Sequence, residues 1–303
     1  MSPQERIEVS VTQELLRATR TLARAAKEED LGAGDVTAML LEPEDQARFE
    51  LPLKQPAVLA GRAVAGEVLG AYNESIEIEW NDEARDGARF ERVPVRLATL
   101  TGPNRSVLAA ERVLLNFLQR LCGVATLTRK YVDAVAGTGA KIFDTRKTTP
   151  GWRLLEKYAV RCGGGHNHRM GLYDAVLIKD NHLAGIEPGR LSHAVFEMLN
   201  RAAAFDPPPE FIEVEADTLE QVEELFKVVG IHVILLDNFS LDDLRRVVER
   251  RDTLGLKDKV ELEASGGVTL ETVAGVARTG VDRISVGAIT HSAAAVDLSL
   301  ARL

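Results

Sequence analysis

The chain has 303 residues, of which 45% are hydrophobic and 27% charged, and this composition excludes a disordered or fibrous protein. Its 37 Lys and Arg against 46 Asp and Glu give a net charge of −9. That balance argues against general nucleic-acid binding, because neutralising phosphates requires a basic surface. No run approaches the roughly 20 apolar residues of a membrane span, so we expect no membrane partner either.

The length fits about two domains of roughly 150 residues each. Cys122 and Cys162 are too few for a disulfide framework, which favours a reducing compartment. The opening residues MSPQERIEV contain no apolar leader segment. We therefore expect a cytoplasmic protein.

The first hundred residues mix helix and strand patterns. A first helix is predicted by apolar positions at helical spacing, namely Leu15, Leu16, Thr19, Leu22, Ala23 and Ala26. The glycine-containing run EDLGAGDVT interrupts this pattern. Strands are predicted by alternation at two places, around Ile76 and Ile78 and again at Val93, Val95 and Leu97. The pattern indicates an α+β domain.

A longer helix is predicted over residues 104–121, where it would link the two domains. Its apolar stripe consists of Val107, Leu108, Leu114, Leu115, Leu118 and Leu121. From residue 140 the pattern changes to short apolar runs separated by helical segments: AKIFD, AVLIKD, FIEVE, HVILLD, VELEASGG and RISVGA. Such runs are typical of parallel strands in repeated βα units, arranged as a barrel or an open sheet.

Charged or small residues stand at the end of each of these six runs. They are Asp144 with Arg146 and Lys147, Lys179 with Asp180, Glu213 with Glu215, Asp237 with Asn238, Ser265 to Gly267, and Gly287. In α/β barrels the active site is built from residues at the carboxyl ends of several strands. We therefore expect the six strand ends to converge on one pocket.

Residues 144–182 form a basic island, with seven Lys or Arg and four Asp or Glu, a net charge of about +3. This is the pattern expected where a small, highly anionic ligand is gathered. Lys179 directly follows an apolar run, so its ammonium group would be costly without an anionic partner. Three of these cations, spaced four residues apart, fit a solvated helix face as well as they fit a ligand-binding group. They are Arg153, Lys157 and Arg161.

Glu215 and Asp237 end their strands opposite these cations. They could form structural salt bridges with the lysines, or hold Mg²⁺ and sugar hydroxyls, since Mg²⁺ prefers hard oxygen ligands. Carboxylates would also stabilise positive charge developing on a reacting sugar carbon. The amides of Ser265, Gly266 and Gly287 could cradle a phosphate, although glycines also serve plain turns.

His166 and His168 form an HxH pair, a spacing that suits a metal site on a strand. With His182 and Asp237 it could resemble the site of a barrel metallohydrolase. Three glycines precede the pair, however, which favours a loop. The chain contains neither GxxxxGK[ST] nor a GxGxxG following a strand, so nucleotide folds of those types are not expected.

The run DTRKTTPGWRLLEKYAVRCGGGHNHRMGLYDAVLIKDNH, residues 144–182, closely resembles the quinolinate phosphoribosyltransferase family, the carboxylating nicotinate-nucleotide pyrophosphorylases. The resemblance extends through EEDLGAGDVT, AERVLLNFLQRLCGVATLT, FIEVE, LLDN, EASGG and SVGAITHS. It implies an α/β fold of two domains. These are an N-terminal α/β sandwich, residues 1–115 with residues 292–303 packing back on it, and an incomplete, seven-stranded α/β barrel of type II phosphoribosyltransferases, residues 116–291.

The resemblance also implies the reaction: transfer of phosphoribosyl from phosphoribosyl pyrophosphate to quinolinate with decarboxylation. The products would be nicotinate mononucleotide, pyrophosphate and CO2, a step of de novo NAD biosynthesis. It further implies a Mg²⁺ cofactor and a homodimer, or an assembly of dimers, in which Arg112 enters the neighbouring active site.

Residue roles follow from the same resemblance. The positions around the quinolinate carboxylates are Arg112, Arg146, His168, Arg169 and Lys179. Lys147 matches a position near the phosphates, and Glu215 and Asp237 match positions on the ribose hydroxyls and Mg²⁺. Further substrate-binding positions, mostly in the phosphate loops, are Ser265, Gly266, Gly267, Gly287 and His291. The catalytic set is expected to be Lys147, Lys179, Glu215 and Asp237.

Three other interpretations remain. A sister enzyme acting on nicotinate would keep the fold without the decarboxylation and would need fewer cations. A relative associated with molybdate transport clusters would share the fold, with unknown chemistry. A metal-dependent barrel hydrolase would instead use His166 and His168 and would bind zinc tightly.

Overall fold

The computed structural model describes residues 9–303 and divides the chain into two compact units. The first unit comprises the residues up to Arg129, Thr148–Gly165 and Ile289–Leu303, and the second comprises Lys130–Lys147 and His166–Ala288. The domain boundaries expected from the sequence stay a prediction. Residues 1–8, which supported the expectation that no leader segment is present, lie outside the described residues.

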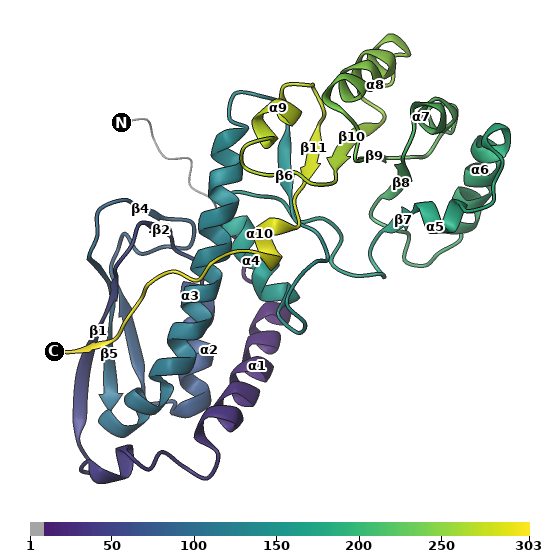
Figure 1. Cartoon of the computed structure of the whole chain (residues 1–303). Coiled ribbons are helices and arrows are strands. Elements are labelled where there is room, and N and C mark those ends of the chain that lie inside the picture. The colour runs from purple at the N-terminus through teal and green to yellow at the C-terminus, as the bar shows by residue number, and fades with distance from the viewer. Residues whose placement is uncertain (1–8) are drawn as a thin grey trace. The chain divides into compact units, whose positions relative to one another are not determined.

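Four strands form an antiparallel sheet in the first unit, in the order β12-β1-β5-β3 (Figure 1). Alternate side chains of β1 are buried, among them Phe49, Leu51 and Leu53, as expected for a strand with one face toward a core. Because β12 pairs with β1, the last residues of the chain complete this sheet. The strands of this unit are β1 (Gln46–Leu53), β2 (Ala57–Val58), β3 (Glu77–Trp80), β4 (Arg89–Phe90), β5 (Val95–Pro103) and β12 (Ala301–Arg302).

The predicted first helix is confirmed as α1, Gln13–Leu31. The Thr12 side-chain oxygen accepts the N–H of Leu15 at 3.1 Å and so satisfies one free donor at the helix start. Leu15 and Ala23 of the predicted apolar face are buried. The other short helices of this unit are η1 (Ala38–Leu40), α2 (Arg62–Tyr72), α4 (Arg153–Cys162) and α10 (Ala288–His291), of which α10 begins at the last residue of the second unit.

The helix predicted over residues 104–121 exists but is longer than predicted. α3 runs over Asn104–Ala134, because its apolar face continues through the buried residues Val124, Ala125 and Tyr131. Along the chain it passes from the first unit into the second. Within residues 9–303, no helix combines the length and the apolar composition that crossing a bilayer requires.

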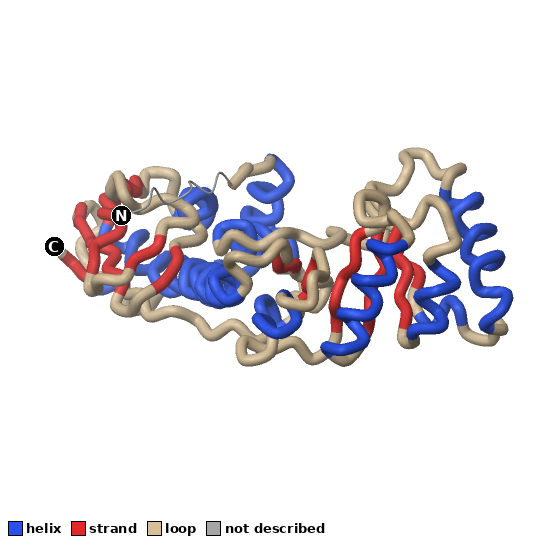
Figure 2. Tube along the Cα trace, turned by 90° about the horizontal axis from the view of Figure 1, so that it is seen from above, coloured by secondary structure: helices blue, strands red, loops and turns tan. Residues whose placement is uncertain are grey.

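All six apolar runs after residue 140 are strands, as predicted, and they form one parallel sheet in the order β6-β11-β10-β9-β8-β7 (Figure 1). Val214, Ile234 and Leu262, at the centres of three strands, are fully buried, as parallel strands covered on both faces require. Figure 2 shows helices (blue) alongside the strands (red) of this unit.

The elements of the second unit follow a βα alternation. They are β6 (Lys141–Phe143), β7 (Val176–Ile178), α5 (Asp180–Leu183), η2 (Pro188–Arg190), α6 (Leu191–Ala202), β8 (Ile212–Ala216), α7 (Leu219–Leu225), β9 (Val233–Asp237), α8 (Leu241–Thr253), β10 (Glu261–Ser265), α9 (Val273–Ala277) and β11 (Arg283–Ser285). Thr218 and Ser240 cap α7 and α8, with side-chain oxygens that accept backbone N–H groups of the first turn.

The expectation of seven barrel strands is wrong for the described residues, which form six. His166 forms only a single parallel bridge with Phe143. The backbone N–H of His166 donates to Ile142 O at 2.8 Å, and the carbonyl oxygen of His166 accepts the N–H of Asp144 at 3.0 Å. Two residues further on, the N–H of His168 donates to the Asp144 carboxylate rather than to a strand carbonyl. Because a side chain takes over the backbone hydrogen bond, the bridge does not extend into a strand.

Gly123 on α3 should not tolerate a side chain. An added Cβ would lie 2.1 Å from the carbonyl oxygen of Ala294, which belongs to the same unit. Gly123→Ala should therefore lower the free energy of unfolding by about 1–3 kcal/mol or more, the cost of overpacking a core. Urea denaturation measures the change.

Gly70→Ala is the matched control, since Gly70 lies on the exposed face of α2 with open space around its Cβ position. It should raise the free energy of unfolding by up to about 1 kcal/mol, the difference in helix propensity between alanine and glycine. Equal effects of the two substitutions would contradict the close approach at Gly123.

Candidate active site

Asp144 organises the loop that carries Arg146 and Lys147 after β6. Its buried carboxylate accepts the N–H of His168 at 2.8 Å and the side-chain N–H of Asn167 at 2.6 Å. The two loops that bear the candidate cations are thereby tied together. Lys147 is exposed at this edge of the unit.

Two guanidinium groups, those of Arg146 and Arg169, interact electrostatically. Arg169 is buried, and burial followed by the positive charge of Arg146 lowers the pKa of Arg169. Arg146 Nε is also buried and has no hydrogen-bond partner among the residues described. Like charges held together in a poorly solvated place suit an anion with more than one carboxylate, which an arginine fork binds with two hydrogen bonds.

Three carboxylates meet at the neighbouring strand ends. Single oxygens of Glu215, Asp217 and Asp237 all lie within 4.8 Å of one another. Burial, followed by the charges of Asp180 and Asp237, raises the pKa of Asp217. The sequence had placed Glu215 and Asp237 together but not Asp217, which follows its strand by one residue.

Lys179 pairs with one of these carboxylates. Its Nζ lies 3.4 Å from Glu215 Oε2, so the salt bridge considered from the sequence does form. With 48% of the Lys179 side chain exposed, such a pair adds little to stability and leaves the ammonium group accessible. The backbone N–H of Lys179 donates to Nδ1 of His182 at 2.8 Å, which fixes the start of α5.

The donor set at the acidic end fits Mg²⁺, which prefers carboxylate oxygens. The metallohydrolase interpretation, in contrast, is wrong. The His166 ring stacks on Phe143 with centroids 5.2 Å apart, His182 accepts the N–H of Lys179, and His168 lies among other glutamates. The histidines required for a zinc site are therefore not brought to Asp237.

The segment from Ser265, the last residue of β10, to Gly267 requires glycine. Gly266 has φ 97°, and an added Cβ would lie 2.2 Å from Oδ1 of Asn238. Asn238, at φ 57°, donates its side-chain N–H to Asp237 at 2.8 Å and its backbone N–H to Ser265 O at 2.9 Å. Asn238 thus ties the acidic end of β9 to the candidate phosphate loop.

The remaining predicted positions divide between the units. Gly287 follows β11 in the second unit, whereas Arg112 and His291 belong to the first. Arg112 is exposed on α3, and His291 is exposed at the end of α10. The roles implied for these three residues stay predictions.

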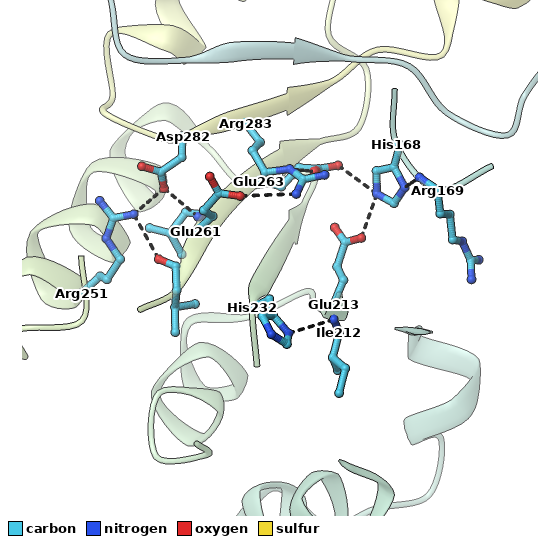
Figure 3. A network of polar contacts seen from close by, with 12 residues as sticks. His168, Arg169, Ile212, Glu213, His232, Arg251, Glu261, Glu263, Asp282 and Arg283 are labelled. Atoms are coloured by element: carbon cyan, nitrogen blue, oxygen red, sulfur yellow. Dashed lines mark hydrogen bonds and ion pairs between the residues drawn. The ribbon is translucent and has the colours of Figure 1, made fainter. Parts of the chain in front are cut away.

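A buried charged cluster lies beneath the strand ends, made of His168, Glu213, Glu263 and Arg283 (Figure 3). His168 Nε2 lies 2.8 Å from Glu213 Oε2 and 3.6 Å from Glu263 Oε1. Arg283 Nε lies 2.7 Å from Glu263 Oε2. Both glutamates are fully buried. This cluster of four residues is called the interior cluster below.

Sequence reasoning missed Glu263 and Arg283 and noted Glu213 only as a strand end. A signal was present, because alternate residues of a strand share a face. Glu213 precedes Glu215 by two residues, and Glu263 precedes Ser265 by two. Charged residues two places before the end of a strand should therefore lie directly beneath the residues at its end.

Burial dominates the ionisation of the interior cluster. It raises the pKa of Glu213 to about 7, with Arg283 and Arg169 acting in the opposite direction. It also raises the pKa of Glu263 to about 7, helped by the charge of Glu213 and opposed by His168 and Arg283. Two carboxylates so close together in the interior favour retention of a proton.

A parallel α/β sheet with cations and carboxylates at adjoining strand ends is typical of an enzyme that acts on a small anionic substrate. Comparison with protein families agrees. Residues 35–122 match the N-terminal domain of quinolinate phosphoribosyl transferase, and residues 124–301 match its C-terminal domain. The chain belongs to the quinolinate phosphoribosyltransferase family, which confirms the resemblance found in the sequence.

Individual relatives cover nearly the whole chain. A carboxylating nicotinate-nucleotide pyrophosphorylase of Mycobacterium leprae is 43% identical, over 93% of this chain and 96% of its own length. A probable enzyme of the same name from Bacillus subtilis is 39% identical, over 90% of this chain and 89% of its own. The solved nicotinate-nucleotide pyrophosphorylase of Francisella tularensis is 36% identical, with a TM-score of 0.85 over 97% of this chain and 98% of that one.

The raised pKa of Glu263 predicts a pH dependence of stability. The folded protein binds this proton more tightly than the unfolded chain, whose carboxyl titrates near 4.5. The stabilising effect is therefore complete below about pH 4.5 and is lost as the pH rises through about 7. Glu263→Gln should flatten the fall in unfolding free energy between about pH 5 and pH 8, measured by urea denaturation.

Glu220→Gln is the control, because Glu220 is exposed at the start of α7. It should keep the slope of the unsubstituted protein. A Glu263→Gln protein with the same slope as this control would show that Glu263 titrates normally.

Proposed function

We propose that this protein transfers phosphoribosyl from phosphoribosyl pyrophosphate to quinolinate, with loss of CO2, and thereby makes nicotinate mononucleotide and pyrophosphate. The observation that carries the proposal is the pairing of a cation with a carboxylate at adjoining strand ends, where Lys179 Nζ, after β7, lies 3.4 Å from Glu215 Oε2 on β8. Quinolinate is a dianion, so its two carboxylates would pair with Lys179 and with the arginines Arg146 and Arg169. Family membership and the named relatives support the same reaction.

In this proposal the cationic side chains bind the pyridine substrate, quinolinate. Arg146 and Arg169 bind its carboxylates, Lys179 reaches them from the end of β7, and His168 lies beside Arg169. Lys147, exposed one residue after Arg146, is assigned to the phosphates of the second substrate. Positioning of the two substrates supplies most of the rate, since no side chain needs to act as a covalent nucleophile.

Charge develops in two places during the transfer. The bond from ribose C1 to the pyrophosphate oxygen breaks, and its electron pair leaves with pyrophosphate, while the ring nitrogen forms a new bond to the same carbon. Glu215 and Asp237 stabilise the positive charge on the sugar. Loss of the ring carboxylate as CO2 leaves an electron pair on carbon next to the cationic nitrogen, and a solvent proton replaces the carboxylate.

Glu215 and Asp237, joined by Asp217, are the residues that would hold Mg²⁺. When bound, the ion would neutralise negative charge on the leaving pyrophosphate. The backbone amides from Ser265 to Gly267 and at Gly287 would receive the 5′-phosphate, and His291 is assigned to the same substrate.

The assembly and the location belong to the proposal as well. We assign the protein to a homodimer, or an assembly of dimers, in the cytoplasm. Arg112 would enter the neighbouring subunit's active site. Arg112 is exposed on α3 next to the buried Val113, and this exposure supports a contact with a partner subunit.

A direct assay tests the reaction. The protein is incubated with quinolinate, phosphoribosyl pyrophosphate and Mg²⁺, and CO2 and nicotinate mononucleotide are measured. Nicotinate replaces quinolinate in the control. We expect product when quinolinate is supplied and no product when nicotinate replaces it. Turnover of nicotinate without release of CO2 would favour the non-decarboxylating sister enzyme.

Lys179→Ala should lower kcat/KM at least about tenfold, because a charge-assisted hydrogen bond is worth about 1.5–3 kcal/mol. The protein should still fold, since about half of the Lys179 side chain, 48%, is exposed. Steady-state kinetics and circular dichroism measure the two effects.

Lys227→Ala is the matched control, because Lys227 also pairs with a glutamate, Glu224, while its side chain is 60% exposed. It should retain full activity. Activity of Lys179→Ala equal to that of this control would remove Lys179 from the site.

A further inference from the structure

A buried ion pair joins separate segments of the first unit. Glu156 on α4 is fully buried, and its Oε1 accepts hydrogen bonds from Nη2 and Nε of Arg120 on α3, at 2.7 Å and 3.1 Å. The same carboxylate accepts the hydroxyl of Thr149 at 2.7 Å and the backbone N–H of Thr149 at 3.1 Å. These four hydrogen bonds satisfy the buried charge. Glu156 and Arg120 are called the α3–α4 ion pair below.

The guanidinium of Arg120 also holds the segment that follows α10 (Figure 1). Its Nη1 donates to the carbonyl oxygen of Ala293 at 2.7 Å, and its Nη2 donates to the carbonyl oxygen of Thr290. His291 is the next residue after Thr290 in the chain. The backbone on both sides of His291 is therefore bonded to one side chain of α3.

The segment at Thr149 is a turn with little freedom. The N–H of Trp152 donates to the carbonyl oxygen of Thr149 at 3.0 Å, and Gly151 has φ 81°. Pro150 and Gly151 stand at the two central positions that these residue types favour in a type II turn. The Trp152 ring lies against Phe117 of α3, with centroids 4.5 Å apart. Because the turn is stiff, a bond to Thr149 fixes the whole turn.

Both held segments lie just after a passage of the chain from the second unit into the first. One passage follows Lys147, and the other follows Ala288. Thr149 and Thr290 are each the second residue beyond a passage. The α3–α4 ion pair therefore bonds to each segment at an equivalent position, close to where that segment enters the first unit.

The residues next to these two positions share one assignment. Lys147 and His291 are both assigned to phosphoribosyl pyrophosphate in the proposed function. Arg146, which is assigned to quinolinate, lies nearer along the chain to Asp144. The Asp144 carboxylate fixes that end of the loop by accepting the N–H of His168 at 2.8 Å. The two ends of the loop are thus held by different carboxylates.

We propose that the α3–α4 ion pair positions the two residues assigned to phosphoribosyl pyrophosphate, Lys147 and His291. It acts through the backbone, by fixing Thr149 on one segment and the carbonyl group of Thr290 on the other. The inference rests on the proposed function, because that function assigns Lys147 and His291 to this substrate. It adds a pair of positioning residues that bind no substrate themselves.

An ion pair that only stabilised the fold would behave differently. Its loss would lower the melting temperature and the amount of folded enzyme, and the KM of each substrate would stay the same. A positioning role instead raises the KM for phosphoribosyl pyrophosphate selectively, because the residues that bind quinolinate keep their own supports. It also predicts recovery by a side chain that restores the lost hydrogen bond.

Glu156→Leu removes the carboxylate while keeping similar volume, and Arg120 retains its two carbonyl partners. The KM for phosphoribosyl pyrophosphate should rise about tenfold, the equivalent of about 1.4 kcal/mol. The KM for quinolinate should change less than about twofold. Steady-state kinetics measures both values, and circular dichroism verifies folding. An unchanged KM for phosphoribosyl pyrophosphate would overturn the proposal.

Thr149→Val decides the question if Glu156→Leu fails to fold, because it leaves the α3–α4 ion pair intact. It removes only the hydroxyl donor and should raise the KM for phosphoribosyl pyrophosphate about fivefold, the equivalent of about 1 kcal/mol. Thr149→Ser keeps the hydroxyl and should stay within about twofold of the unsubstituted protein. Equal KM values for the valine and serine variants would contradict the positioning role.

The double variant of Glu156→Leu and Thr149→Val tests whether Thr149 acts through Glu156. If it does, the double variant should have the same KM for phosphoribosyl pyrophosphate as Glu156→Leu alone, since both substitutions break one interaction. Multiplication of the two single effects would mean that Thr149 acts on the substrate independently, against the proposal.

Tyr158→Phe provides the matched control on the same helix. Tyr158 is also buried on α4, and its hydroxyl accepts the N–H of Gly61 at 3.1 Å and donates to Asp86. Its loss should lower the melting temperature without changing the KM for phosphoribosyl pyrophosphate. An equal rise in this KM for Tyr158→Phe would assign the Glu156 effect to general destabilisation of α4.

Binding measurements distinguish this inference from the proposed function. Isothermal titration calorimetry with phosphoribosyl pyrophosphate and Mg²⁺ gives a dissociation constant that should rise in Glu156→Leu as the KM does. If the unsubstituted protein binds this compound but does not convert quinolinate, the proposed function fails and the dissociation constants still test the positioning role. If Lys147→Ala and His291→Ala weaken binding while Glu156→Leu and Thr149→Val do not, the assignment of the two residues stands and the positioning role fails.

Discussion

The second unit depends on the pairing of charges within its parallel sheet. A carboxylate in the interior is costly unless a cation or a donor faces it, and β8 and β10 each bury one. His168 and Arg283 meet that requirement for Glu213 and Glu263. Because the partners come from separate elements, the charges hold these elements in one register. An apolar interior of the same volume would impose weaker restrictions, since dispersion contacts are not directional.

The interior cluster is continuous with the candidate active site. Glu215 and Ser265 lie two residues beyond Glu213 and Glu263 on the same strands, so the groups proposed to bind the sugar and phosphate rest on the paired charges beneath them. The charges of the site are divided between two groups, with Arg146 and Arg169 in the loops between β6 and β7 and three carboxylates at the ends of β8 and β9. Such an arrangement is preorganised for a reaction that separates charge, because the stabilising groups need not move as charge develops.

Much of the fold was predictable because periodicity is a local property. The six apolar runs, the first helix and the start of α3 follow from side chains that repeat at intervals of two or 3.6 residues. The extent of α3 and the missing seventh strand were not predictable in this way. Both depend on a competition between neighbouring groups, such as the Asp144 carboxylate that takes the N–H of His168 from a strand partner. Lys157 shows the same limit: its helical spacing fitted a solvated face, yet it is fully buried.

By itself, the amino-acid sequence determined the family, the class of fold and the end of each strand, since these depend on residue types at fixed spacing. The tertiary structure alone decided which histidine faces which partner. His166 stacks on Phe143, while His168, two residues later, enters the interior between Glu213 and Glu263. These partners come from strands far apart in the chain, so no local pattern records them. The partner that each histidine takes is decided by the cost of burying a charge. That cost arises only after the sheet has formed and has excluded water from the charge.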